Sequence, residues 1–295
     1  MTSWIGIDGG QSGTRLVTSD GRSGCGRGFV HGGDPVGVNL GLIREALGDA
    51  GVGGPFETAC LGLTGMPGDP VLRDELAAAV VELLGVRELR LSGDCVTAHA
   101  GALPGGYGVV VAAGTGMIAF ALGDRVSHVV DGAGYLFGDD GGCFSIGRAA
   151  VAAAVRAADG RGPATKLEVP DLAGLYTSPA AVAEVAALTP HVFAVAAEGD
   201  AVARSIVDWA VDQLAHTITI AVRTLPAGEV PVAYTGGLFR AGEQLLAPLR
   251  AAVAVRAPQA RLLPAAGPPL AGAARLASGP LGPYENAVQV YGRGR

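Results

Sequence analysis

The stretch Trp4-Ile5-Gly6-Ile7 runs directly into Asp8-Gly9-Gly10-Gln11-Ser12-Gly13-Thr14-Arg15 and then into Leu16-Val17-Thr18. An apolar run, a turn of glycines and small hydroxyl residues, and a second alternating run predict a β-hairpin. Consecutive backbone N–H groups in such a turn can bind an anion, and a carboxylate where the first strand ends can hold a metal ion through water. The stretch therefore predicts either a nucleotide-phosphate turn with Asp8 as its metal residue, or an ordinary Asp-Gly-Gly hairpin.

The length and net charge of the chain limit the classes of protein to which it can belong. The chain has 295 residues, 49% of them hydrophobic, which is enough for two domains with buried cores. Its net charge is −6 and its arginines are scattered, so we expect neither a nucleic-acid partner nor an anionic membrane. The N-terminus lacks a signal-peptide pattern and no apolar run is long enough to cross a membrane, so we expect a cytoplasmic protein.

The cysteines and histidines show no metal-site or redox spacing. There is no Cys-x-x-Cys and no Cys/His group, which predicts separate, reduced thiols and structural histidines. These residues are Cys25, Cys60, Cys95, Cys143, His31, His99, His128, His191 and His216.

Hydrophobic periodicity predicts an α/β chain built from two similar halves, each starting with three hairpin strands. Residues 103–108 interrupt the pattern, so we expect domains at 1–103 and 104–295. In the first half we expect strands at 3–8, 14–18, 24–30, 58–63 and 87–91 and helices at 37–50, 70–84 and from Asp94. In the second we expect strands at 108–113, 116–122, 125–130 and 230–234 and helices near 142–158, 179–197, 200–224, 241–254 and 268–278.

Two further motifs repeat the chemistry of the first turn. Val109-Val110-Val111-Ala112-Ala113-Gly114-Thr115-Gly116-Met117-Ile118-Ala119-Phe120 is again a strand, a glycine and threonine turn, and a strand. Val232-Ala233-Tyr234-Thr235-Gly236-Gly237-Leu238-Phe239 is a strand that ends in a glycine pair, where a purine could lie against bare backbone.

These three ordered motifs resemble those of the sugar kinase, heat-shock ATPase and actin superfamily. The resemblance implies a two-domain actin-like (ribonuclease H-like) fold with duplicated βββαβαβα units, which binds ATP and Mg²⁺ in an interdomain cleft. It implies a first phosphate turn of Gly9, Gly10, Gln11, Ser12 and Thr14, a second of Gly114, Thr115 and Gly116, an adenosine contact of Gly236, Gly237 and Leu238, and Asp8 as the metal residue.

A longer segment, Gly132-Ala133-Gly134-Tyr135-Leu136-Phe137-Gly138-Asp139-Asp140-Gly141-Gly142-Cys143-Phe144-Ser145-Ile146-Gly147, is similar to one in the N-acetylglucosamine kinase and BadF/BadG/BcrA/BcrD-type ATPase branch. That branch usually has Gly-Asp-Glu-Gly-Ser where this chain has Gly-Asp-Asp-Gly-Gly. The segment is also expected to cap the helix that follows it, because carboxylates favour a helix N-terminus.

Asp94, in Leu91-Ser92-Gly93-Asp94-Cys95, lies between a predicted strand and a predicted helix. A carboxylate there can accept the proton of a hydroxyl that attacks a γ-phosphoryl group, although Asp is also a common helix N-cap. In the similar kinases the matching aspartate is the catalytic base. We therefore predict that Asp94 is the general base.

The resemblance also implies a sugar acceptor and, for this chain, a homodimer. Its sugar contacts would be Asn39, Thr64, Gly65, Asp94, Gly134 and Asp139, although Asn39 could instead mark the beginning of a helix. Ala133, Met117 and Ser145 stand where the N-acetylglucosamine kinases usually have Trp, Ser and Trp, so the acceptor stays open among glucosamine, N-acetylglucosamine, glucose and a larger amino sugar.

Two other functions use the same motifs. One is an ATP-hydrolysing activator of a dehydratase or reductase, which needs cysteines to share an iron–sulfur cluster across a dimer; Cys143 lies near such a position. The other is a sugar sensor without turnover. The ROK sugar kinases are disfavoured because the chain lacks their cysteine-rich zinc motif.

Overall fold

The computed structural model describes residues 3–30, 32–124 and 126–292. The chain divides into two compact units, and each is discontinuous in sequence. The first consists of residues 1–110, 122–127 and 264–295, and the second of residues 111–121 and 128–263. The sequence predicted a single division at 103/104, whereas here the last segment of the chain belongs with the first unit.

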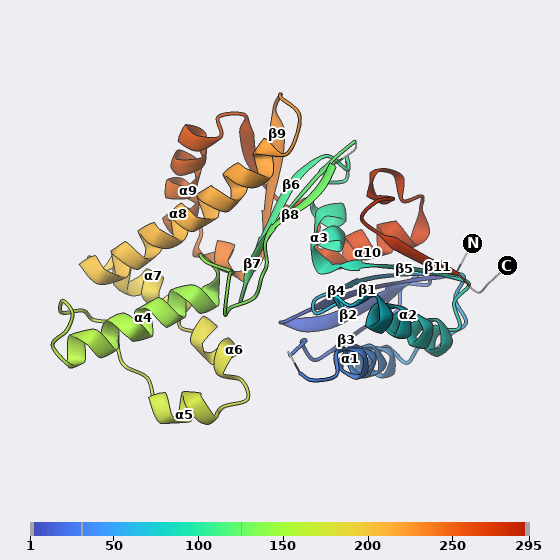
Figure 1. The fold of residues 1–295 in the computed structure, drawn as a ribbon, viewed down its shortest axis with the longest axis horizontal. Helices are drawn as coiled ribbons and strands as arrows, with labels where there is room; N and C mark the ends of the chain where they lie inside the picture. Colours follow the sequence, from blue (N-terminus) through green and yellow to red (C-terminus); the bar gives the residue numbers. More distant parts are fainter. Residues whose placement is uncertain (1–2, 31, 125, 293–295) are drawn as a thin grey trace. The chain divides into compact units, whose positions relative to one another are not determined.

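The first unit is built on a mixed six-stranded sheet with the order β11-β5-β4-β1-β2-β3. β1 pairs antiparallel with β2 and parallel with β4, so the N-terminal hairpin is continuous with a parallel core (Figure 1). β5 joins β4 in parallel, and β11 closes the far edge antiparallel to β5. The strands are β1 Trp4–Gly10, β2 Gly13–Thr18, β3 Ser23–Gly26, β4 Thr58–Leu63, β5 Glu88–Gly93 and β11 Gln289–Gly292.

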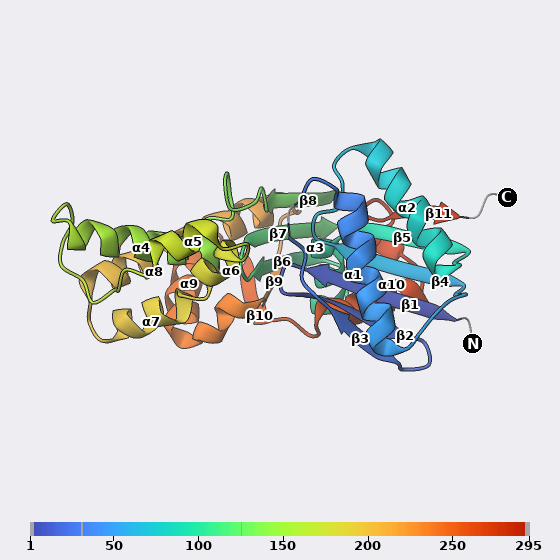
Figure 2. The same cartoon turned by 90° about the horizontal axis from the view of Figure 1, so that it is seen from below.

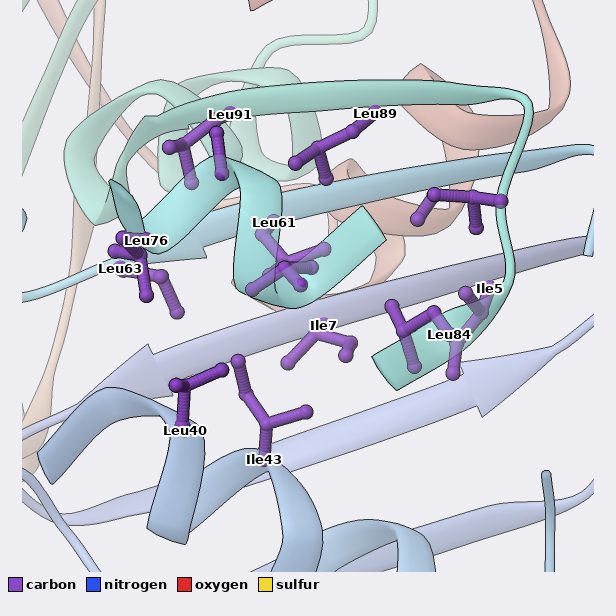
Figure 3. Close-up of a cluster of buried hydrophobic side chains, with 14 of the residues drawn as sticks. Ile5, Ile7, Leu40, Ile43, Leu61, Leu63, Leu76, Leu84, Leu89 and Leu91 are labelled. Carbon is purple, nitrogen blue, oxygen red and sulfur yellow. The ribbon is translucent and has the colours of Figure 1, made fainter. Parts of the chain in front are cut away.

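Two helices, α1 (Pro35–Ala50) and α2 (Pro70–Leu84), cover one face of this sheet. Both have an aspartate N-cap, a proline in the first turn and a left-handed glycine at the C-terminus, which are strong local start and stop signals. Their apolar faces pack on alternate strand residues (Figure 3). This core includes Ile5, Ile7, Leu16, Leu40, Ile43, Leu61, Leu76, Leu84, Leu89 and Leu91, all at most 9% exposed.

The opposite face carries α3 (Asp94–Ala102) and α10 (Pro269–Ser278), which lie side by side (Figures 1 and 2). Glycines let both helices approach the strands closely. A Cβ on Gly6 would lie 2.7 Å from the backbone nitrogen of Ala274, and one on Gly62 would lie 2.1 Å from Thr97 Oγ1. The buried imidazole of His99, on α3, contacts the Tyr284 hydroxyl at 2.9 Å and the Gly108 carbonyl at 3.2 Å. Tyr284 ends the short 3₁₀ helix η2 (Gly282–Tyr284).

The second unit repeats the strand order of the first. Its sheet has the order β10-β9-β6-β7-β8, which corresponds to β5-β4-β1-β2-β3. The predicted duplication is therefore confirmed, and with it the two-domain actin-like α/β fold. The division between units falls inside β6, β7, β8 and β10. The strands are β6 Gly108–Ala113, β7 Met117–Gly123, β8 Val126–Asp131, β9 Val230–Thr235 and β10 Ala260–Pro264.

Helices make up most of the second unit. The predicted helix at 179–197 is two helices, because Thr189-Pro190 begins a new one. Strands β10 and β11 and the helix α5 (Leu172–Thr177) were not predicted, and β3 ends at Gly26 rather than at residue 30. The helices are α4 Cys143–Ala158, α5 Leu172–Thr177, α6 Ala181–Ala186, α7 Thr189–Ala197, α8 Ala201–Arg223, the 3₁₀ helix η1 Gly237–Ala241 and α9 Glu243–Arg256.

Within the described ranges, no single helix has the length and apolarity to span a membrane, and one bent pair, Ala181–Ala197 with Ala201–Arg223, meets these criteria by length and composition alone.

Candidate active site

Asp8 lies on β1 and faces α3, with its carboxylate buried. Thr97 Oγ1, on α3, donates to Asp8 Oδ1 at 3.2 Å. Burial and then the nearby charge of Asp94 raise the pKa of Asp8 to about 7, while the Thr97 hydroxyl and the Arg15 guanidinium oppose the rise. A nearby cation would therefore strongly favour the charged form of the Asp8 carboxylate.

Asp94 is the first residue of α3, directly after β5. Gly93, not Asp94, is the N-cap residue, so Asp94 is not the N-cap that its sequence position also allowed. Its Oδ2 instead accepts a hydrogen bond from the Thr64 hydroxyl. Burial raises the pKa of Asp94, and the Thr64 hydroxyl with the first N–H groups of α3 opposes that rise. The carboxylate is therefore both desolvated and held, as a general base requires.

The predicted first phosphate turn connects β1 and β2. Gly10 and Gln11 are half-buried and Ser12 is exposed, so the turn presents its backbone at the surface. Gly9 and Thr14 face each other across the hairpin. Thr14 Oγ1 is buried and has no hydrogen-bond partner among the described residues. An orphaned buried hydroxyl is unusual, and this one lies in the predicted phosphate turn.

Arg15 is a further candidate site residue, which was not predicted from the sequence. It pairs with Asp8 across the hairpin, so the two side chains share a face. A Cβ on Gly13 would lie 3.8 Å from Arg15 Nη2, which places the guanidinium beside the phosphate turn. The only signal in the sequence was the distance of Arg15 from Asp8 along the chain, because antiparallel pairing across the turn puts these two residues opposite each other.

The other predicted sugar contacts of the first unit lie beside Asp94. Asn39, buried on α1, donates from Nδ2 to the Pro35 carbonyl at 2.9 Å and to the Gly65 carbonyl at 3.5 Å. Asn39 lies inside α1 rather than at its beginning, which Asp34 caps. The structure therefore brings Asn39, Thr64, Gly65 and Asp94 together through contacts within one unit.

In the second unit, hydrogen bonds connect the predicted second phosphate turn to the beginning of α4. The Gly114 carbonyl accepts from the Cys143 N–H at 2.8 Å, and the Thr115 carbonyl accepts from the Phe144 N–H at 2.9 Å. The backbone nitrogen of Gly114 also donates to the Gly116 carbonyl at 2.9 Å. These bonds fix the turn relative to the helix.

Asp139 organises the segment that precedes α4. Its Oδ1 accepts from the Gly134 N–H at 3.3 Å, so these two predicted sugar contacts bind each other. A Cβ on Gly116 would lie 2.2 Å from Asp139 Oδ2, so Asp139 also lies against the phosphate turn. Asp131 Oδ1 accepts from the Asp139 N–H at 2.8 Å, and both aspartates have a positive φ, 62° and 61°. The segment is thus held in a conformation that few residues adopt.

The predicted adenosine motif follows β9. Gly236 has φ 108°, and a Cβ there would lie 2.2 Å from the Ala113 carbonyl oxygen, so this position requires glycine. Gly236 and Gly237 are exposed, whereas the Leu238 side chain is 2% exposed. Leu238 could therefore contact adenosine only through its backbone.

The positions that depart from the N-acetylglucosamine kinase pattern differ in their surroundings. Met117 and Ser145 are buried, and the Ser145 hydroxyl accepts from the Gly141 N–H at 2.9 Å and donates to the Gly142 carbonyl at 2.9 Å. Ala133 is exposed. Only the Ala133 change thus alters an exposed surface directly.

Comparison with known families matches residues 5–271 to the BadF/BadG/BcrA/BcrD ATPase family. The chain belongs to this family. A search of curated protein sequences finds no match.

Three solved structures that are similar to this member of the BadF/BadG/BcrA/BcrD ATPase family carry the names of sugar kinases. A Chromobacterium violaceum protein provisionally named N-acetylglucosamine kinase is 26% identical with a TM-score of 0.68, over 92% of this chain and 98% of that one. A Porphyromonas gingivalis protein with the same provisional name is 18% identical with a TM-score of 0.66, and the match covers 92% of this chain and 96% of that one. A ROK family glucokinase from Streptomyces griseus, solved with glucose and AMPPNP, is 19% identical with a TM-score of 0.59, and the match covers 93% of this chain and 99% of that one. The latter two show a shared fold.

Proposed function

We propose that this chain is an ATP-dependent kinase that phosphorylates a hydroxyl of a hexosamine or hexose, with N-acetylglucosamine or glucosamine and their 6-hydroxyl as the first candidates. One observation carries the proposal. Asp94 is a desolvated carboxylate at a strand end, held by a hydroxyl, in the same unit as the phosphate turn. An enzyme that only hydrolyses ATP would not need a base beside a sugar site.

In the proposed reaction the sugar hydroxyl oxygen attacks the γ-phosphorus of ATP. The new oxygen–phosphorus bond forms as the bond from the γ-phosphorus to the bridging oxygen of ADP breaks, and the hydroxyl proton passes to Asp94. Asn39, Gly65 and Asp139 are proposed to hold the other sugar hydroxyls. Missing hydroxyls would leave these polar groups unpaired, which gives discrimination between sugars.

ATP is proposed to bind through the turn of Gly9, Gly10, Gln11, Ser12 and Thr14, through Gly114, Thr115 and Gly116, and through Gly236 and Gly237. The orphaned Thr14 hydroxyl and the partly exposed backbone of the turn fit a ligand rich in acceptor oxygens. The position of the Arg15 guanidinium adds a positive charge for the phosphates.

A Mg²⁺ ion would be oriented by Asp8, because carboxylate oxygens suit a hard cation, and the charge of the ion would oppose the raised pKa of Asp8. Such an ion would offset the negative charge of the phosphates. Among residues 3–30, 32–124 and 126–292, no three His, Cys, Asp or Glu side chains gather as metal ligands.

The test is Mg²⁺-dependent release of ADP from ATP by the purified chain, with glucosamine, N-acetylglucosamine, N-acetylmannosamine, N-acetylmuramic acid, glucose or no sugar. We expect a strong rate with one acceptor. In the Asp94→Asn variant we expect ATP to bind as before and the sugar-dependent rate to fall by about two orders of magnitude or more. A rate independent of sugar would favour the activator-type ATPase, and near-normal turnover of Asp94→Asn would remove Asp94 from its role.

The alternative function, an activator-type ATPase, can be tested independently through the iron–sulfur cluster that it would need. All four cysteines are free thiols, two of them buried. Burial raises the pKa of Cys143, which does not favour the thiolate that an iron ligand must be. Iron and sulfide analysis of the purified chain, with visible absorption, would detect a cluster directly.

A further inference from the structure

We infer that Thr64 is a positioning residue that holds the carboxylate of Asp94 through its hydroxyl, rather than a sugar contact. This inference rests on the proposed function of Asp94 and names the group that orients it. The deciding contact is the hydrogen bond from Thr64 Oγ1 to Asp94 Oδ2.

The backbone that carries the Thr64 hydroxyl is fixed on both sides. The Thr64 N–H donates to the Gly9 carbonyl at 2.7 Å, which extends the pairing of β1 and β4 by one residue beyond Leu63. Gly65 follows with φ +69°, and a Cβ on it would lie 2.0 Å from Cζ of the Phe29 ring. Phe29 is itself 5% exposed, so the ring has little room to move away. The hydroxyl therefore projects from a rigid strand end.

Asp94 is held only partly by its own helix. Its backbone begins α3, and the first N–H groups of that helix interact favourably with the carboxylate. Of the described side chains, Thr64 alone donates to it. The Thr64 bond therefore engages Oδ2 and, together with these N–H groups, fixes the orientation of the carboxylate.

The Thr64 hydroxyl has a single proton, and that proton is engaged by Asp94. Toward a sugar, the hydroxyl could act only as an acceptor. Its larger effect should be on the geometry of proton transfer, because a general base must lie within hydrogen-bond reach of the attacking hydroxyl. Loss of the Thr64 hydroxyl should therefore lower kcat more than it raises the KM for the sugar.

The experiment measures kcat, KM for ATP and KM for the best acceptor of the sugar panel. Thr64→Val keeps the shape of the side chain and removes the donor, whereas Thr64→Ser keeps the donor. Thr219→Val is the matched control, because Thr219 is a buried threonine whose hydroxyl donates to the Ala215 carbonyl at 2.7 Å on α8. We expect kcat to fall about 10- to 100-fold in Thr64→Val with KM for ATP within about twofold. Thr64→Ser should retain most of the wild-type kcat, and Thr219→Val should retain all of it.

A double variant separates positioning from sugar contact. If Thr64 acts through Asp94, then adding Thr64→Val to Asp94→Asn should cause no further loss of kcat. A further loss equal to that of Thr64→Val alone would overturn the inference, as would an unchanged kcat or a rise in sugar KM alone. Should Thr64→Val fail to fold, Thr64→Ala in both backgrounds provides the same comparison.

The two proposals fail in different ways. A wild-type chain with no sugar-dependent rate overturns the proposed function and the inference with it. A wild-type chain that is active, with an inactive Asp94→Asn and a normal Thr64→Val, overturns only the inference.

Discussion

The Thr97 hydroxyl lies 3.2 Å from Asp8 Oδ1, and this bond joins the helix that begins with Asp94 to the strand that carries the proposed metal residue. The same hydroxyl is 2.9 Å from the Asp94 carbonyl. Gly62, the neighbour of Asp8 on β4, leaves the space that Thr97 occupies. Three residues on separate elements thus fix the spacing of the two carboxylates.

A side chain on Gly62 should disturb this arrangement. In Gly62→Ala the new Cβ would lie 2.1 Å from Thr97 Oγ1, so α3 must shift. We expect a loss of about 1–3 kcal/mol in the free energy of unfolding, together with a lower kcat. Gly41→Ala on α1 is the control, because nothing lies within 4 Å of its Cβ and alanine favours a helix. Denaturant unfolding measures the free energy of unfolding of Gly62→Ala and Gly41→Ala, and equal stability of the two variants would contradict the packing argument.

Arg15 should matter for ATP. Removing the guanidinium in Arg15→Met should raise the KM for ATP about tenfold or more, because it eliminates the positive charge beside the phosphate turn. Arg15→Lys should recover part of the affinity, since a lysine keeps the charge but not the planar donors. Arg22→Met is the matched control, as Arg22 is paired with Asp20 at the opposite end of β2. An ATP KM that responds equally to Arg15→Met and Arg22→Met would rule out the role.

Substitutions of the predicted sugar contacts should change different kinetic constants in the first and second units. Asn39→Ala should raise the KM for the sugar with little change in the KM for ATP. Asp139→Ala should raise both, because Asp139 also packs against Gly116 of the second phosphate turn. Asn286→Ala, an exposed amide elsewhere, serves as the control. Unchanged sugar kinetics in both Asn39→Ala and Asp139→Ala would relocate the sugar site.

His99 predicts a pH dependence of stability. Burial lowers the pKa of His99 to about 4, below its ordinary value of 6.5. As the pH falls from 6.5 toward 4, the unfolded chain takes up a proton that the folded chain excludes, so stability decreases over that window. The contribution is at most about 3 kcal/mol.

The measurement uses denaturant unfolding at pH 7, 5.5 and 4.5. The chain has two tryptophans, and Trp209→Phe leaves Trp4, on β1, as the fluorescent reporter of the first unit. In that background His99→Gln should lose less stability on acidification than the histidine form. Identical pH slopes would show that His99 is protonated equally in both states.

Local signals explain what the sequence predicted well. Asp34, Asp69, Gly51 and Gly85 mark the ends of α1 and α2, and those helices were predicted to within about two residues. The first two motif turns also lie between the strands where they were expected, and the glycine pair of the third motif follows its predicted strand. Such features depend on neighbouring residues only, so a single sequence contains them.

What the sequence did not predict depends on distant partners. β11 is short and exists through its pairing with β5. The Thr64 bond to Asp94 and the Thr97 bond to Asp8 join residues 30 and 89 positions apart. The sequence identified Thr64, Asp94 and Asp8 as site residues, yet it could not say which of them touch. The roles of the predicted site residues in catalysis stay predictions.

The return of α10 and β11 to the first unit has a consequence for synthesis of the chain. On the ribosome, β1 to β5 emerge long before α10, by on the order of ten seconds at ordinary elongation rates. Through that interval the edge of β5 and the faces of Gly6 and β4 beneath α10 are uncovered. The nascent first unit should therefore depend on chaperones until the last segment of the chain is made.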